Sequence, residues 1–249
     1  MINNDLFITI VVMFVLSILS LFVLAGVAIW SGVEFYKYKT FKFLPVKLSL
    51  ILIPLLVIYF GIPFWFLGAA YNNYNSEKAE SFYDLAIKTA LMPSVKALMY
   101  NEKGAYYVLY FKGSEAIAAY EKSYEIKKDD APLHHLCMLY TIKGDYDKAV
   151  GTCVQTSHNQ MAAINSILNK NYTLALNVIN VEFKNEQPTC WDYAVRGYIY
   201  RALGRKDRFE SDFDTAFNLC PKNDKLRELY ENSSYYEEYY TDLRKKFHF

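Results

Sequence analysis

Hydrophobic and polar residues are distributed unevenly along the chain: two long hydrophobic stretches lie near its start, and mixed sequence with helical spacing follows. The first stretch, Leu6 to Trp30, has no charged residue in 25 positions. At a rise of about 1.5 Å per residue, such a helix exceeds a bilayer's hydrocarbon core of about 30 Å. The second, Leu48 to Leu67, is also uncharged and contains Pro54 and Pro63, which transmembrane helices tolerate. The pattern predicts a two-helix transmembrane hairpin as a membrane anchor over residues 1–70.

The linker between the two stretches carries the charge that sets their orientation. Residues 31–47 contain four lysines and one glutamate, whereas the five residues before the first stretch contain no Lys or Arg. The positive-inside rule places this linker in the cytoplasm, with both termini on the periplasmic side of an inner (cytoplasmic) membrane, or on another extracytoplasmic side. Aromatic residues alternate with the lysines, as in segments that contact membrane lipid headgroups. A cleaved signal peptide is disfavoured, because the first stretch is too long and lacks a basic start.

Residues 71–249 show the spacing of amphipathic helices. From Tyr71 to Leu91, hydrophobic residues recur every three or four positions, which predicts a helix that extends the second span and completes a first, partial hairpin. Pro93 marks a break before the next helix. The stretch from Ala97 to Asp130 contains two amphipathic helices joined by a short turn. Variants of it follow over residues 130–156, 159–185 and 190–223.

The repeated unit resembles the tetratricopeptide repeat, a helix–turn–helix of about 34 residues. The first copy carries the pattern at Tyr100, Gly104, Tyr107, Ala116, Tyr120 and Ile126. The last copy carries it at Tyr193, Gly197, Tyr200, Gly204, Phe213, Ala216 and Pro221, and departs from it at Phe209, where a small residue is expected. The two middle copies are abbreviated, with turns at 144–146 and 171–172. The resemblance implies an all-α fold, a solenoid of about four helical hairpins over residues 71–249.

The segment 224–249 is expected to cap the last repeat, because the end of a solenoid needs a polar outer face. Its apolar edge has helical spacing and consists of Leu226, Leu229 and Tyr230. Four tyrosines and two glutamates between positions 235 and 240 leave two interpretations open. They belong either to a solvated capping helix or to a helix that docks a partner.

All four cysteines, Cys137, Cys153, Cys190 and Cys220, follow the second hydrophobic stretch. In an antiparallel hairpin, residues equally distant from the turn face each other. The first two cysteines are centred on residue 145 and the last two on residue 205, each next to a predicted turn glycine. This register predicts the bridges Cys137–Cys153 and Cys190–Cys220, and therefore an oxidising compartment. Two alternatives remain: small buried cysteines that fill the helix seams, or a metal site with His134 and His135, for which no CxxC or HExxH spacing exists.

Little in the sequence points to catalysis. A formal net charge of +1 disfavours nucleic-acid binding, and neither a phosphate-binding glycine loop nor a GxSxG motif is present. The four histidines are scattered, and acidic pairs such as Asp212 and Asp214 are expected on solvated faces. We therefore expect no enzyme activity, cofactor, metal, nucleic acid or small-molecule substrate. Asn171 and Asn232 begin glycosylation sequons, which an extracytoplasmic placement would expose.

The resemblance also implies where partners would bind, because the first helix of each tetratricopeptide hairpin lines an inner, concave face. Matching positions give a candidate partner-binding set of Asn101, Ala105, Val108, His134, Met138, Thr141, Trp191, Tyr198 and Arg201. Trp191, Tyr198 and Arg201 are the strongest candidates, because Trp, Tyr and Arg are enriched at binding hot spots. The alternative is that these aromatic residues only pack between helices.

These features favour a membrane-anchored scaffold whose extracytoplasmic repeats bind other protein subunits of a cell-envelope complex. A second hypothesis is a chaperone-like receptor that holds client polypeptides, because the layout is similar to that of two-span cytochrome c maturation subunits. A third is an accessory subunit of a channel or transporter, in which Pro54, Gly61 and Pro63 pack against a larger membrane partner. Neither span contains an ionisable Asp, Glu, Lys, Arg or His, which disfavours a conduction pathway through this chain.

Overall fold

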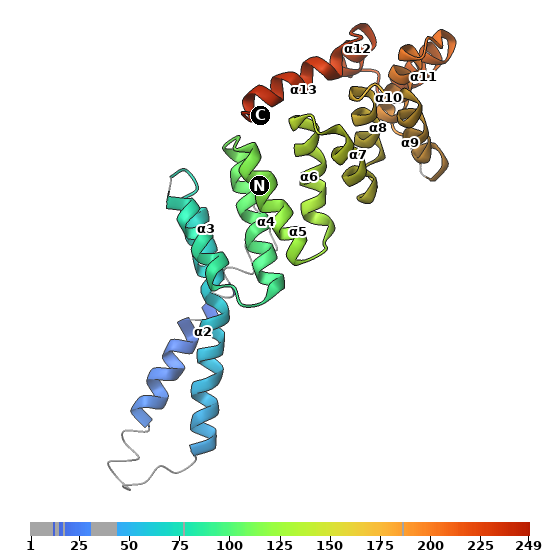
Figure 1. Cartoon of the computed structure of the whole chain (residues 1–249). Coiled ribbons are helices and arrows are strands. Elements are labelled where there is room, and N and C mark those ends of the chain that lie inside the picture. Colours follow the sequence, from blue (N-terminus) through green and yellow to red (C-terminus); the bar gives the residue numbers. More distant parts are fainter. Residues whose placement is uncertain (1–11, 13–14, 17, 31–43, 77, 186) are drawn as a thin grey trace. The chain divides into compact units, whose positions relative to one another are not determined.

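The structure is a computed structural model that describes residues 12, 15–16, 18–30, 44–76, 78–185 and 187–249. All regular elements in these residues are helices (Figure 1). The chain forms two compact units, Met1–Lys103 and Gly104–Phe249, called here the first and the second unit. The boundary between the two units lies within α4, Pro93–Leu109. The predicted boundary between the anchor and the repeats, at residues 70 and 71, where the sequence changes from apolar to charged, lies instead within α2, Leu44–Asn72.

The first unit contains one helix that is long and apolar enough to cross a membrane by length and composition, among the described residues. This is the segment Leu50–Asn72 of α2, with a mean hydropathy of 2.4 and both internal prolines inside the helix. The described part of the other hydrophobic stretch is a shorter apolar helix, Ile18–Trp30. The rest of that stretch and most of the predicted basic linker, residues 31–43, lie outside the described residues. A second span therefore stays a prediction.

The predicted continuous helix from Tyr71 to Leu91 is wrong at its start. Helix α2 ends at Asn72, and a turn precedes α3, Lys78–Thr89, which packs back along α2. The turn forms because the Asn73 side-chain amide donates to the Ala69 carbonyl and the main-chain carbonyl of Asn73 accepts from the Ser76 N–H at 2.8 Å. These contacts compete with the helix for backbone groups.

The second unit contains three complete helical hairpins and the end of a further one. The first hairpin pairs α4 with α5, Gly113–Ile126, and the next pairs α6, Asp130–Lys143, with α7, Tyr146–Gln155. The remaining elements are α8, Asn159–Leu168; α9, Tyr172–Asn185; α10, Cys190–Ala202; α11, Lys206–Leu219; α12, Asp224–Glu231; and α13, Tyr235–Lys246. The predicted repeat boundaries at residues 130, 159 and 190 coincide with the starts of α6, α8 and α10.

Local sequence signals explain these boundaries. The side chain of Asp129 accepts from the Ala131 N–H at the start of α6, and Thr189 with Asp192 forms a capping box at the start of α10. Gly144 ends α6 at φ +89°, a left-handed conformation that glycine adopts without strain. The helices then approach closely over Gly197: a Cβ at this position would lie 2.7 Å from the Phe213 ring.

The large side chain of Phe209, at a position where the repeat pattern has a small residue, packs against α12. Its ring stacks on Tyr230 with centroids 5.1 Å apart and an interplanar angle of 10°. Tyr230 also contacts the ring of Phe213, which is fully buried between α10 and α11. Position 209 thus departs from the repeat pattern because the last hairpin packs against α12 and not against another repeat.

Asp212 lies on the inside of the last hairpin, so its expected place on a solvated face is wrong. The Arg196 guanidinium donates to both Asp212 carboxylate oxygens, at 2.8 and 2.7 Å. Arg196 also lies 3.5 Å from the centroid of the Phe183 ring, a cation–π contact that joins α9 to α10. The neighbouring Asp214 is exposed. The buried pair therefore links three helices, α9, α10 and α11.

Candidate partner-binding face

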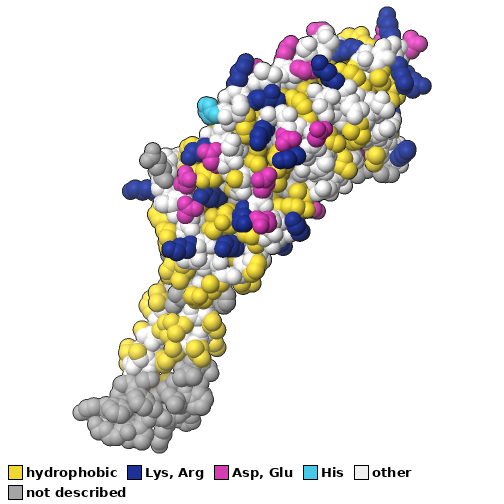
Figure 2. Space-filling view, viewed as in Figure 1, with side chains coloured by type: hydrophobic (Ala, Val, Ile, Leu, Met, Phe, Trp, Pro, Cys, Tyr) yellow, Lys and Arg dark blue, Asp and Glu magenta, His cyan; other side chains and the backbone are white. Residues whose placement is uncertain are grey.

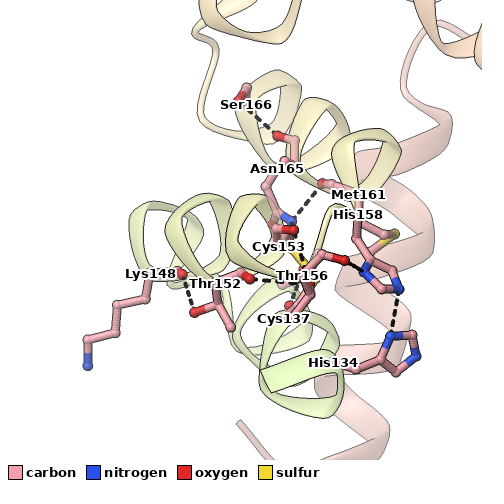
Figure 3. The surroundings of a disulfide bond; sticks show 12 residues. His134, Cys137, Lys148, Thr152, Cys153, Thr156, His158, Met161, Asn165 and Ser166 are labelled. Atoms are coloured by element: carbon pink, nitrogen blue, oxygen red, sulfur yellow. Dashed lines mark hydrogen bonds between the residues drawn. A yellow bond between two sulfur atoms is a disulfide. The ribbon is translucent and has the colours of Figure 1, made fainter. Parts of the chain in front are cut away.

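The four cysteines form two bridges, Cys137–Cys153 and Cys190–Cys220, which are the pairs that the turn positions predict. The first joins the middle of α6 to the last turn of α7, and the second closes the open end of the α10–α11 hairpin. Cys137 and Cys153 are buried against Ala162, and the Asn165 amide lies 3.7 Å from the Cys153 sulfur (Figure 3). The bridge therefore lies in the seam where α6, α7 and α8 meet.

The histidines nearest this bridge form a pair. His134 Nδ1 lies 2.6 Å from His158 Nε2, and His158 Nδ1 lies 2.7 Å from the Thr156 carbonyl oxygen (Figure 3). His135 points elsewhere, and its ring stacks on the Tyr120 ring. Among the described residues, no three side chains of His, Cys, Asp or Glu are grouped to hold a metal ion. The His134–His158 hydrogen bond requires one ring to donate and the other to accept, so full protonation of both rings breaks it.

Acidification is expected to destabilise the second unit through this cluster. Burial, followed by the neighbouring His158, lowers the pKa of His134, and burial, followed by His134, lowers that of His135. A lowered folded-state pKa means that the unfolded chain binds protons more readily. The contribution of the neutral histidines to the stability of the fold is therefore complete above about pH 6.5, and it is lost as the pH falls toward their lowered pKa values in the folded state. The urea unfolding midpoint should therefore fall less between pH 7.5 and pH 5.5 in His134→Gln than in His248→Gln. The second variant is the control, because His248 is exposed.

Five of the six principal candidate residues for partner binding lie in the second unit, and Asn101 lies half-buried in the first. His134 and Met138 are exposed on α6, and Trp191 is half-buried on α10. Tyr198 is only 3% exposed, and Arg201 is half-buried. The end of the same chain covers Tyr198 and Arg201 in this structure, and their role in partner binding stays a prediction.

We call the surface formed by α6, α8 and α10 the inner face, and α13 lies on it. At α10, the Tyr198 hydroxyl donates to the Ser233 carbonyl, and its ring packs edge-on against Tyr236 at 5.0 Å. Burial, followed by the nearby Glu237 carboxylate, raises the pKa of Tyr198, so its hydroxyl stays a donor. Arg201 donates to the carbonyls of Leu229, Tyr230 and Asn232 and so fixes the turn between α12 and α13.

Beyond this turn, α13 continues across the earlier hairpins (Figure 1). Tyr240 is buried, and its hydroxyl lies 3.7 Å from the Met161 sulfur on α8. Arg244 donates to the Ile142 carbonyl at the end of α6 and to the Tyr146 hydroxyl, both at 3.0 Å. Phe247 is also buried and meets the Phe111 ring at 5.2 Å, next to the α4–α5 turn. One short helix thus touches four successive hairpins.

A hollow of about 200 Å³ remains beside α13 on the inner face. Its floor includes Ile164 of α8 and Val195 of α10, and tyrosines of α13 form much of its wall. Trp191 also lines it, together with the side chains of Gln160 and Lys225. Trp191 is therefore the predicted hot-spot residue that keeps an open position next to a largely aromatic cavity.

The sequence predicts the tyrosine-rich helix but not the surface on which it packs. The signal was present: the α13 side chains that face the repeats are Tyr236, Tyr240, Leu243, Arg244 and Phe247, which share one side of a helix. Such a stripe shows that a helix packs on something, but not on which surface. The contacts of Arg244 join residues about 100 positions apart (102 and 98), so no local pattern specifies them.

Comparison with known proteins supports the repeat assignment in part. Residues 193–223 match the model of the tetratricopeptide repeat family, and this segment covers most of α10 and all of α11. A solved structure, that of a tetratricopeptide repeat protein from Parabacteroides merdae ATCC 43184, is 18% identical, with a TM-score of 0.44. The alignment covers 84% of this chain and 83% of that chain. No curated protein matches the sequence. The segment 193–223 is thus similar to one tetratricopeptide repeat.

Proposed function

We propose that this chain is a membrane-anchored tetratricopeptide scaffold whose repeats bind another protein subunit of an envelope complex. The observation that carries the proposal is that the inner face holds a helix, α13, through side chains of successive hairpins. A surface that binds one amphipathic helix has the shape and the mixed chemistry to bind another. The face combines the aromatic ring of Tyr198, the thioether of Met161 and the carbonyl acceptor of Ile142, and no group arranged for catalysis is needed for this role.

Membrane anchoring is supported by the exposed surface of the first unit. Large hydrophobic side chains of α2 are solvent-exposed, Ile53 to 61% and Leu56 to 52%, and those of Ile18–Trp30 are too, Phe22 to 71%. The coloured part of α2 shows hydrophobic side chains and no charge in Figure 2, whereas charges of both signs are interspersed elsewhere on the face in view. Exposed apolar surface of this extent favours contact with lipid.

An extracytoplasmic location for the repeats is supported by the two disulfides, because such bonds persist mainly in oxidising compartments. The lysine-rich linker supports the same orientation. Protease added to intact spheroplasts should therefore degrade the repeats and spare the spans. Protection of the repeats until the membrane is lysed would place them in the cytoplasm.

Photo-crosslinking in native membranes tests the scaffold function. A benzophenone amino acid at Met138, exposed on α6, should give one discrete adduct of a larger protein. The same group at Asp214, exposed on α11, is the matched control and should give none. A ladder of many adducts at Met138 would instead indicate a chaperone-like receptor for diverse clients, and equal adducts at both positions would contradict a specific inner-face site.

A further inference from the structure

We propose that α13 is a displaceable occupant of the inner face, and that the partner of this face is a helix with aromatic residues at the spacing of α13. This inference rests on the proposed function, because it names the kind of partner that the repeats would bind. It also makes a statement about the chain alone, namely that α13 can leave its position while the hairpins stay folded.

The inner face offers a series of separate positions along α13. Tyr198 receives the edge of an aromatic ring at Tyr236, and Met161 receives the next aromatic side chain four residues later, at Tyr240. The Ile142 carbonyl at the end of α6 accepts a hydrogen bond from the basic side chain of Arg244, eight residues after Tyr236. An aromatic ring then follows at Phe247, against Phe111. The ligand that these positions specify is an amphipathic helix with three aromatic residues and one arginine or lysine.

The turns of the repeats are shaped to receive the end of this helix. A side chain at Gly113 would overlap the ring of Phe249, and one at Gly144 would overlap the Arg244 guanidinium. Gly144 also needs its left-handed conformation. Gly113 is the first residue of α5 and has no positive φ, so backbone geometry does not require a glycine there. The space over Gly113 therefore exists for a residue beyond α13, or for its counterpart in a partner.

Helix α13 is less buried than the inner repeat helix α10. Two of its 12 residues are buried and seven are exposed, whereas eight of the 13 residues of α10 are buried. The outer helices α7 and α9 also bury two residues each, but each of them is paired with a more buried helix of its hairpin. Local opening free energies are lowest for segments with few buried contacts. Helix α13 meets that condition better than any of the hairpins.

The inner face is larger than the helix that covers it. The hollow of about 200 Å³ beside Tyr236 and Tyr240 lies between α13 and the repeats and is lined by Trp191 as well. The hollow is open to solvent and mostly apolar, so a side chain that fills it would bury additional apolar surface. A partner helix with a larger aromatic residue there, above all tryptophan, would fill it and would compete with α13.

A peptide-binding experiment on the full chain tests the inference. The probe is a fluorescent synthetic peptide with the sequence of residues 234–249, and its anisotropy is measured with the detergent-solubilised chain. Tyr236→Ala with Tyr240→Ala weakens the chain's own helix, and Thr241→Ala, exposed on α13, is the matched control. We expect the double variant to bind the peptide at least tenfold more tightly than the wild type and the control. A peptide with both tyrosines replaced by alanine should bind none of them.

Equal peptide affinity for the wild type, the control and a folded double variant would overturn the inference. Circular dichroism and recovery of both disulfides establish folding. If the double variant does not fold, Arg244→Ala decides, because it removes only the contacts with Ile142 and Tyr146. It should raise peptide affinity, and no increase would overturn the inference. A wild-type dimer that the peptide dissociates would assign the inner face to a second copy of the chain and would also overturn it.

The peptide result is independent of any natural partner. Peptide binding together with no discrete adduct at Met138 would retain α13 as a displaceable occupant and reject the scaffold function. A discrete adduct whose yield is the same in the wild type and the double variant would retain the scaffold function and reject competition by α13. The two failures are therefore distinguishable.

Discussion

Replacing either disulfide is expected to lower the free energy of unfolding of the second unit by about 3 kcal/mol or more. Each bridge restricts the unfolded chain, and the effect grows with the length of the closed loop. The loop is 16 residues for Cys137–Cys153 and 30 residues for Cys190–Cys220. Loop entropy predicts about 3 kcal/mol for the first and about 3.5 kcal/mol for the second. Because a domain is stabilised by only about 5–15 kcal/mol, loss of both would leave little net stability.

Paired Cys→Ala variants measure each effect, because they remove the bridge without leaving a free thiol. Urea unfolding followed by circular dichroism should show both midpoints shifted downward, more for Cys190→Ala with Cys220→Ala. Hydrogen exchange adds the location: loss of Cys137–Cys153 should speed exchange in α6, α7 and α8 before α10. A reducing agent should not lower the midpoint of a variant that lacks both bridges. A loss below about 1 kcal/mol for either pair would contradict the entropic argument.

Asp212→Ala is expected to cost about 3 kcal/mol, because it leaves the Arg196 guanidinium partly buried without its carboxylate. The side chains of Arg196 and Asp212 are only 18% and 8% exposed, so water replaces the lost partner poorly. By contrast, the side chains of the ion pair Lys122–Glu125 are both largely exposed.

Two further variants separate charge from position. Asp212→Asn keeps hydrogen-bonding oxygen and nitrogen atoms in place and should cost less than Asp212→Ala. Asp214→Ala, exposed on the same helix, is the matched control and should stay within about 0.5 kcal/mol of the wild type. Equal losses for Asp212→Ala and Asp214→Ala in urea unfolding would show that the buried pair contributes nothing specific.

The helices, their ends and the register of the hairpins could be predicted from the sequence because local interactions set them. Helical spacing, the caps at Asp129 and Thr189 and the glycine at position 144 act within one or two turns of chain. The disulfide pairing followed as well, because a tight turn makes residues at equal distances from it face each other. The error at residues 73–76 has the same local origin: the side chains of Asn73 and Ser76 hydrogen-bond to nearby carbonyls and form a turn, in a segment that the hydrophobic spacing predicts as helix.

The sequence by itself thus determined the helical hairpins, the positions of the two bridges and the family that the repeats resemble. Only the tertiary structure decided that Asp212 is buried, that Phe209 packs on α12 and that Tyr198 and Arg201 bind the chain's own C-terminal segment. The physical reason is distance along the chain. A stripe such as Tyr236, Tyr240 and Phe247 predicts that a helix is covered on one side. The surface that covers it is built from residues as much as about 130 positions away in the sequence. These residues come together only when the hairpins have stacked.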